Sequence, residues 1–175
     1  MENTKLASAV LRICLSYVLM HLDINIGNLD MLPEWMGYLL ILSTLKTLSE
    51  YKRASSLLKP LGVALMLCSF IGWILNSYGA GISVYSITAV VSALSLFFHF
   101  RLLTDIADIA YDTVGSNASI IFARNARTVL STVMALPISW QDAAALSWIL
   151  ILLQIVTIAV LLISLMSFKS SLTDK

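Results

Sequence analysis

The sequence predicts an all-α fold, a polytopic transmembrane helical bundle with six spans that forms a single domain over residues 1–175. Apolar residues make up 59% of the chain and charged residues only 12%. Soluble domains contain about 45–50% apolar and about 25% charged residues, so the apolar excess indicates a surface that faces lipid. Six spans of about 20 residues would occupy about 120 residues, which leaves short loops and no room for a separate soluble domain.

Each predicted span is an apolar run bounded by charged or turn-forming residues. The first run is not a signal peptide, because Arg12 interrupts it and no small-residue cleavage site follows. Arg12 lies inside this span, where it reaches the headgroups or pairs within the bundle. The fourth helix is expected to continue past its span to about residue 112. The expected spans are residues 6–22, 34–48, 57–77, 82–103, 118–136 and 143–168.

The second span is predicted to begin at a loop that contains acids and no bases. Pro33 suits the start of a helix because its missing N–H would have no partner there, and Glu34 favours the positive end of the helix dipole. Trp35 and Tyr38 are placed for an interfacial aromatic belt. Gly37 is expected to permit close approach of a neighbouring backbone.

Two later spans carry features that bear on packing. In the third span the small residues Ala64, Cys68 and Gly72 recur every four positions, which predicts a helix-packing seam. The fifth span has few apolar residues, and Arg124 and Arg127 are expected to reach back to the headgroups. The alternative is that this helix is re-entrant or lies at the interface, which would leave five full spans.

Charge asymmetry orients the bundle. The loops on one side contain no Lys or Arg, and their acids are Asp23, Asp30, Glu34 and Asp142. Basic residues accumulate on the cytoplasmic side of membrane proteins, so both termini are predicted to be cytoplasmic. Apart from Arg12, the chain's bases fall on that side: Lys5, Lys46, Lys52, Arg53, Lys59, Arg101, Arg124, Arg127, Lys169 and Lys175.

A set of polar residues near the inner side forms the first candidate site. Arg101, Asp105, Asp108 and Asp112 share one helix face, and three stacked carboxylates suit a magnesium ion. The D-x-x-D-x-x-x-D spacing resembles the first aspartate motif of the intramembrane aromatic prenyltransferases, which implies a diphosphate-bound magnesium, although their second motif is missing. The alternative is a solvated helix extension with Arg101 paired to Asp105. The candidate inner polar cluster is Arg12, His99, Arg101, Asp105, Asp108, Asp112, Arg124 and Arg127.

The outer loop forms the second candidate site. Its acids could attract a cation at an outer mouth, or its histidine could respond to pH. A water-exposed loop that only avoids bases explains the same pattern. The candidate ligand-binding residues are His21, Asp23, Asp30, Glu34 and Trp35.

The segment from Ile24 to Ile41 reads I-N-I-G, then L-P-E-W-M-G-Y-L-L-I after four further residues. It resembles an element in a group of small, functionally uncharacterised bacterial membrane proteins, which implies the cytoplasmic membrane of a bacterium. The six-helix length and the proline-containing entry to the second helix are similar to the substrate-binding S-components of energy-coupling-factor transporters.

We therefore expect a non-enzymatic protein that binds or transports a small solute, or a subunit of a membrane complex. The chain shows no catalytic residue set, and no cofactor is expected. The expected partners are the lipid bilayer and a membrane protein or a second copy of the chain, and nucleic acid is not expected. The alternatives are a magnesium-dependent lipid- or isoprenoid-modifying enzyme that uses Asp105, Asp108 and Asp112, and an immunity-type or structural membrane protein.

Overall fold

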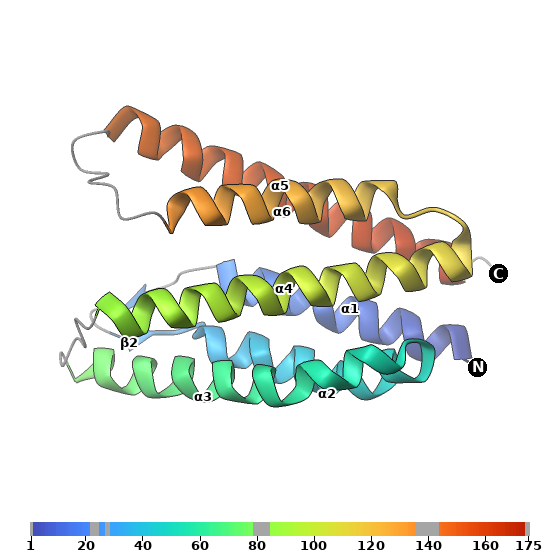
Figure 1. Cartoon of the computed structure of the whole chain (residues 1–175), viewed down its shortest axis with the longest axis horizontal. Coiled ribbons are helices and arrows are strands. Elements are labelled where there is room, and N and C mark those ends of the chain that lie inside the picture. The colour runs from blue at the N-terminus through green and yellow to red at the C-terminus, as the bar shows by residue number, and fades with distance from the viewer. Residues whose placement is uncertain (1, 22–24, 27–28, 79–84, 136–143, 174–175) are drawn as a thin grey trace.

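The computed structural model describes residues 2–21, 25–26, 29–78, 85–135 and 144–173. Within these residues the fold is all-helical apart from one minimal pair of strands. Six α-helices follow one another, and each runs antiparallel to the one before it (Figure 1). The helices are α1 (Glu2–His21), α2 (Glu34–Tyr51), α3 (Leu58–Ser77), α4 (Tyr85–Val114), α5 (Ala118–Met134) and α6 (Ala144–Thr173).

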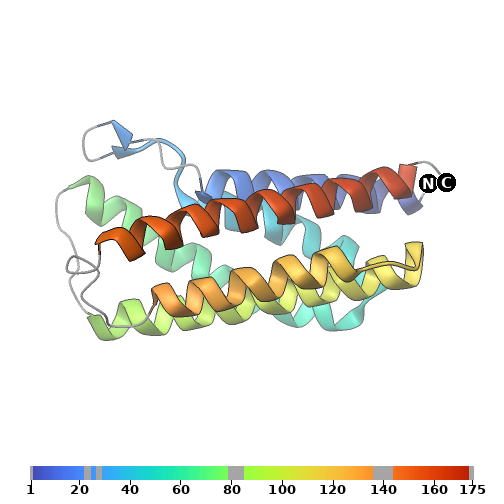
Figure 2. The same ribbon diagram turned by 90° about the horizontal axis from the view of Figure 1, so that it is seen from above.

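The helices form a closed ring in which consecutive helices are neighbours. α6 packs against α1 as well as against α5, so the first and last helices close the ring (Figure 2). α1 begins and α6 ends at one end of the bundle, and the 3-10 helix η1 (Arg53–Leu57) between α2 and α3 lies there too (Figure 1). We call this the terminal end, and we call the opposite end, where the strands lie, the strand end.

The strand pair falls in the segment expected to be an irregular acidic loop. β1 (Asn25–Ile26) and β2 (Leu29–Asp30) pair antiparallel, with Asn25 opposite Asp30 and Ile26 opposite Leu29. The pair is only two residues long on each side, so it orders the connection between α1 and α2 without adding a sheet layer.

Pro33 and Gly115 determine where α2 begins and where α4 ends. Pro33 has φ −67° and caps the start of α2, where its carbonyl accepts a 3.0 Å hydrogen bond from the Met36 N–H. Gly115 has φ +83°, a conformation that favours glycine because it has no Cβ, and its N–H donates to the Tyr111 carbonyl at 2.9 Å. The glycine ends α4 and allows the chain to turn into α5.

The helices α1, α2 and α4 contribute much of the buried core, and α6 completes it. Gly37 brings α1 and α2 together, because a Cβ at this position would lie only 3.0 Å from the Ser16 carbonyl oxygen. The close approach predicted for Gly37 is therefore confirmed. The largest fully buried side chains of these three helices include Leu6, Ile13, Tyr17, Ile41, Leu48, Phe98, Leu102 and Ile106.

The outer surface of the bundle is strongly apolar. Phe97 on α4 is 59% exposed, and Ile163 on α6 is 70% exposed. Exposed apolar area on this scale marks a surface that contacts another apolar phase. Among the described residues, three helical segments are long and apolar enough to cross a membrane: Arg53–Ser77, Ala89–Val114 and Ala145–Thr173.

The small-residue seam predicted on α3 does not pack within the chain. Ala64, Cys68 and Gly72 are all exposed, and a Cβ on Gly72 would meet nothing within 4 Å. Residue spacing identifies a face of a helix but not what covers it, and no helix of the described chain covers this one. The seam faces the surroundings of the bundle.

Candidate functional site

A cluster of aromatic and polar side chains lies inside the ring of helices. The Tyr17 hydroxyl and the His99 Nδ1 form a 3.1 Å hydrogen bond between α1 and α4, and both side chains are buried. Tyr38 on α2 packs its ring 5.8 Å from the His99 ring, and its hydroxyl lies 2.9 Å from the Ser95 Oγ. Two hydrogen-bonded pairs from three helices thus lie side by side.

Arg127 brings a positive charge to this group from α5. Its guanidinium carbon lies 5.0 Å from the centre of the Tyr17 ring, which is cation–π distance. The Arg127 Nε is buried and has no hydrogen-bond partner. Among the described residues no carboxylate lies within ion-pair distance of this side chain. A cation in apolar surroundings is costly unless it is paired, so this arginine calls for an anionic partner.

His21 completes the cluster at the strand end. Its Nδ1 donates a 2.8 Å hydrogen bond to the Tyr17 carbonyl, and its ring lies 6.3 Å from the Tyr17 ring. His21 is the last residue of α1, and Tyr38 lies in the second turn of α2. Tyr17 and Tyr38 therefore lie about 6 Å from the ends of their own helices, whereas His99 and Arg127 lie near the middle of α4 and α5. We call this group the interior cluster: Tyr17, His21, Tyr38, Ser95, His99 and Arg127.

A second group surrounds a buried carboxylate nearer the terminal end. The Asp105 side chain is fully buried, and its Oδ2 accepts a 2.9 Å hydrogen bond from Ser55 of η1. Its Oδ1 lies 3.2 Å from the Arg101 Nη2 and 3.6 Å from the Lys52 Nζ. Oδ1 accepts no hydrogen bond of good geometry, so these two cations balance its charge. Lys52 also pairs with Asp108.

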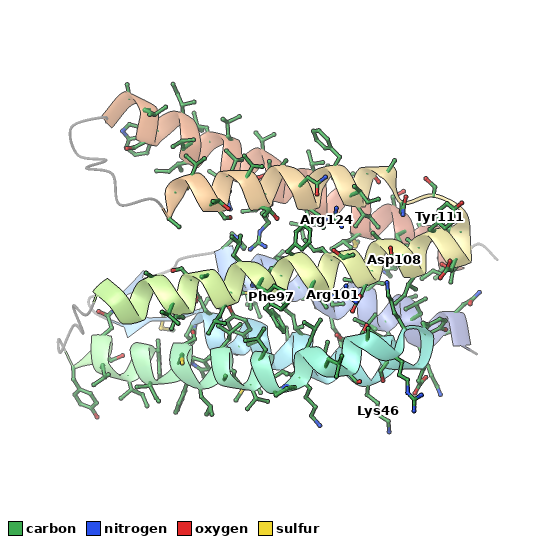
Figure 3. The ribbon with its side chains drawn as sticks, viewed as in Figure 1. Lys46, Phe97, Arg101, Asp108, Tyr111 and Arg124 are labelled. Atoms are coloured by element: carbon green, nitrogen blue, oxygen red, sulfur yellow. The ribbon has the colours of Figure 1, made fainter. Side chains whose placement is uncertain are left out.

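The charged residues predicted to share one face of α4 therefore have different surroundings in the structure. Arg101, Asp108 and Tyr111 follow one another along α4 toward the terminal end (Figure 3). Asp112 is exposed and lines an open hollow of about 360 Å³ together with Lys52, Asp108, Tyr111 and Asn117. Within the described part of the chain, no group of three His, Cys, Asp or Glu side chains is placed to hold a metal ion.

The remaining members of the predicted inner polar cluster lie apart from one another. Arg124 lies between α5 and α4, where its Nη1 donates to the Thr104 Oγ1 at 2.9 Å and its guanidinium carbon lies 4.5 Å from the Phe100 ring centre (Figure 3). Arg12 is exposed and lines a groove between α1 and α2. Only His99 and Arg127 of the eight predicted residues meet in the interior cluster.

The residues of the predicted outer mouth also separate. His21 turns inward to Tyr17, and Trp35 packs edge-on against Phe70 at 5.4 Å on α3. Glu34 is exposed at the start of α2. Asp23 lies outside the described residues, as does the side chain of Asp30, whose backbone belongs to β2.

Sequence reasoning missed Tyr17, Ser95 and Ser55 as members of these groups, and it placed Tyr38, which the structure buries, in an interfacial aromatic belt. Tyr17 lies one helical turn before His21 within an apolar run, and this spacing places both side chains on one face. That signal was available. Ser95 and Ser55 have no comparable signal, because their partners are 57 and 50 residues away in the chain.

Comparison of the chain with protein-family models, with curated proteins and with solved structures finds no match.

Proposed function

We propose that the chain is an integral membrane protein that crosses a bacterial cytoplasmic membrane six times and binds a small anionic solute at the interior cluster, without catalysing a reaction. The single observation that carries the solute site is Arg127, a cation inside the bundle whose Nε has no hydrogen-bond partner. Both termini and the basic residues would face the cytoplasm, and the strand end would face outward.

The six crossings are supported by the arrangement of the helices. Three segments are apolar and long enough by themselves, and α1, α2 and α5 complete the same antiparallel ring. α5 has 17 residues and is therefore about 26 Å long, slightly less than the hydrocarbon thickness of about 30 Å. Arg124 lies in its second turn, close enough to the terminal end for the side chain to serve the headgroup region.

The chemistry of the interior cluster favours an anion over a cation. Arg127 supplies N–H donors, and His99 can add its Nε2–H when its Nδ1 accepts the hydrogen bond from the Tyr17 hydroxyl. Carboxylates and phosphates match such donors, and the guanidinium can bind them in a bidentate manner. His99 and Arg127 lie near the middle of α4 and α5, whereas Tyr17 and Tyr38 lie about one turn from the ends of α1 and α2 that face the strands, so a solute would enter from the outer side at these ends.

Thermal unfolding of the purified protein in a mild detergent tests the solute site. The probes are monocarboxylates, dicarboxylates and inorganic phosphate, and binding raises the melting temperature by mass action. In Arg127→Gln we expect the affinity for the stabilising anion to fall about 30-fold or more, because the half-buried cation that would pair with it is lost.

Arg124→Gln is the matched control, since it removes the same charge from the same helix one turn away. It should retain the anion response. An equal loss in both variants would assign the effect to net charge and refute the site. A wild-type protein that no anion stabilises would favour a membrane-complex subunit or an immunity-type protein without a small ligand.

The enzymatic alternative has less support from the geometry. A magnesium-dependent lipid- or isoprenoid-modifying enzyme would need free carboxylates on α4. Asp105 is fully buried between Arg101 and Lys52, and Asp108 pairs with the same lysine. A magnesium-dependent activity on a prenyl or lipid diphosphate that disappears in Asp108→Ala would establish this alternative instead.

A further inference from the structure

A groove between α1 and α2 at the terminal end has the composition of an anion site. It encloses about 430 Å³ and is lined by Thr4, Lys5, Ser8 and Arg12 of α1 and by Thr44 and Thr47 of α2. Lys5, Ser8 and Arg12 follow one another at helical spacing, so one face of α1 presents all three to the groove. No acidic side chain lines it.

Apart from Thr44, the polar side chains of the groove form no hydrogen bond or ion pair with the described part of the fold. Lys5 and Arg12 are exposed and form no ion pair with any described residue. The Thr44 hydroxyl donates a 2.7 Å hydrogen bond to the Ile41 carbonyl, so it lines the groove but does not donate to a ligand. Ser8 and Thr47 line the groove with hydroxyls that bond to no other described side chain or backbone group, and they remain able to donate.

The position of the groove matches the depth of a phospholipid headgroup. The step of seven residues from Lys5 to Arg12 covers about 10 Å along α1. The headgroup region on each side of a bilayer is about 5–7 Å thick, so Arg12 reaches the boundary with the acyl chains while Lys5 lies at the water side. One turn deeper than Arg12, Leu15 is 49% exposed and begins an apolar surface on the same side of α1.

We propose that this groove binds the phosphate of an anionic phospholipid from the cytoplasmic leaflet, with Lys5 and Arg12 as the charged contacts and Ser8 and Thr47 as hydroxyl donors. The site lies at the terminal end, away from the interior cluster, and it rests on the proposed membrane orientation but not on the anionic solute. The apolar surface at Leu15 favours a lipid, because a soluble phosphate would gain nothing from it.

Native mass spectrometry of the full chain in a nonionic detergent tests the site by titration with phosphatidylglycerol and with phosphatidylcholine. We expect phosphatidylglycerol to bind at least tenfold more tightly. Each base near an anionic lipid contributes roughly fivefold in affinity, so Lys5→Gln with Arg12→Gln should weaken phosphatidylglycerol binding about 25-fold.

The control variant also removes two positive charges at the terminal end of the bundle. Lys46 and Lys59 are exposed and do not line the groove, and Lys46 points away from the helices (Figure 3). Lys46→Gln with Lys59→Gln should change phosphatidylglycerol binding by less than about twofold, and Lys5→Arg with Arg12→Lys should retain it. Equal losses in the two glutamine pairs, or equal binding of both lipids, would overturn the site.

Competition with inorganic phosphate distinguishes a phospholipid headgroup from a soluble phosphate compound as the ligand of the groove. At low millimolar concentration it should not displace phosphatidylglycerol from the wild-type protein. Displacement that disappears in Lys5→Gln with Arg12→Gln would assign the groove to a soluble phosphate compound and overturn the lipid assignment.

Discussion

The carboxylate of Asp105 should be the most sensitive single polar group for stability. Its side chain is fully buried and contacts Ser55, Arg101 and Lys52. Asp105→Asn keeps the size of the side chain but removes the charge that faces two cations. Breaking a buried ion pair from one side costs about 3–5 kcal/mol.

The expected cost is smaller here because water reaches the cations. The side chains of Lys52 and Arg101 are 27% and 39% exposed, and Lys52 retains Asp108 as a partner. We therefore expect Asp105→Asn to destabilise the protein by about 2–3 kcal/mol. For a chain of this length each kcal/mol lowers the melting temperature by about 2–4 °C, so the shift should be about 4–12 °C.

Asp108→Asn provides the comparison on the same helix. The Asp108 side chain is 46% exposed, and an exposed pair contributes less than about 1 kcal/mol. Thermal unfolding in detergent, followed by circular dichroism, should give a drop below about 3 °C for this variant. Equal shifts for the two asparagine variants, or a larger one for Asp108→Asn, would refute the assignment of Asp105 as a buried structural charge.

Two further substitutions test the packing and the interior cluster. Gly37→Ala should lower the free energy of unfolding by about 1–3 kcal/mol, because the new Cβ would crowd Met20 and the Ser16 carbonyl. Gly72→Ala has open space around it and should be neutral or stabilising. An equal loss in both variants would contradict the close contact between α1 and α2. Tyr17→Phe removes the hydrogen bond to His99 but keeps the ring beside Arg127. We therefore expect the free energy of unfolding to fall by about 1–2 kcal/mol. An unchanged melting temperature would show that this hydrogen bond does not stabilise the fold.

Several helix ends were predictable because a proline or glycine beside the apolar run sets them. α2 begins at Glu34 directly after Pro33, as expected, and α4 ends at Val114 next to Gly115. α6 continues to Thr173, five residues past its expected span, because no proline or glycine interrupts it as it leaves the apolar region.

The candidate sites were less predictable because their contacts join residues far apart in the chain. The pairing of Arg101 with Asp105 follows from their spacing on one helix, and the structure contains it. The meeting of Tyr17 with His99 depends on how α1 and α4 pack, which no local pattern reveals. For the same reason Arg127, expected to reach back to the headgroups, was not predicted to face Tyr17.

The most direct test of the six crossings uses single cysteines in a chain whose Cys14 and Cys68 are replaced by serine. Asp30→Cys should react with a membrane-impermeant maleimide in intact cells, whereas Ser56→Cys, Ser116→Cys and Thr173→Cys should react only after permeabilisation. Labelling of residues 30 and 56 from the same side would contradict the crossing of α2, and labelling of residue 173 from outside would contradict the crossing of α5.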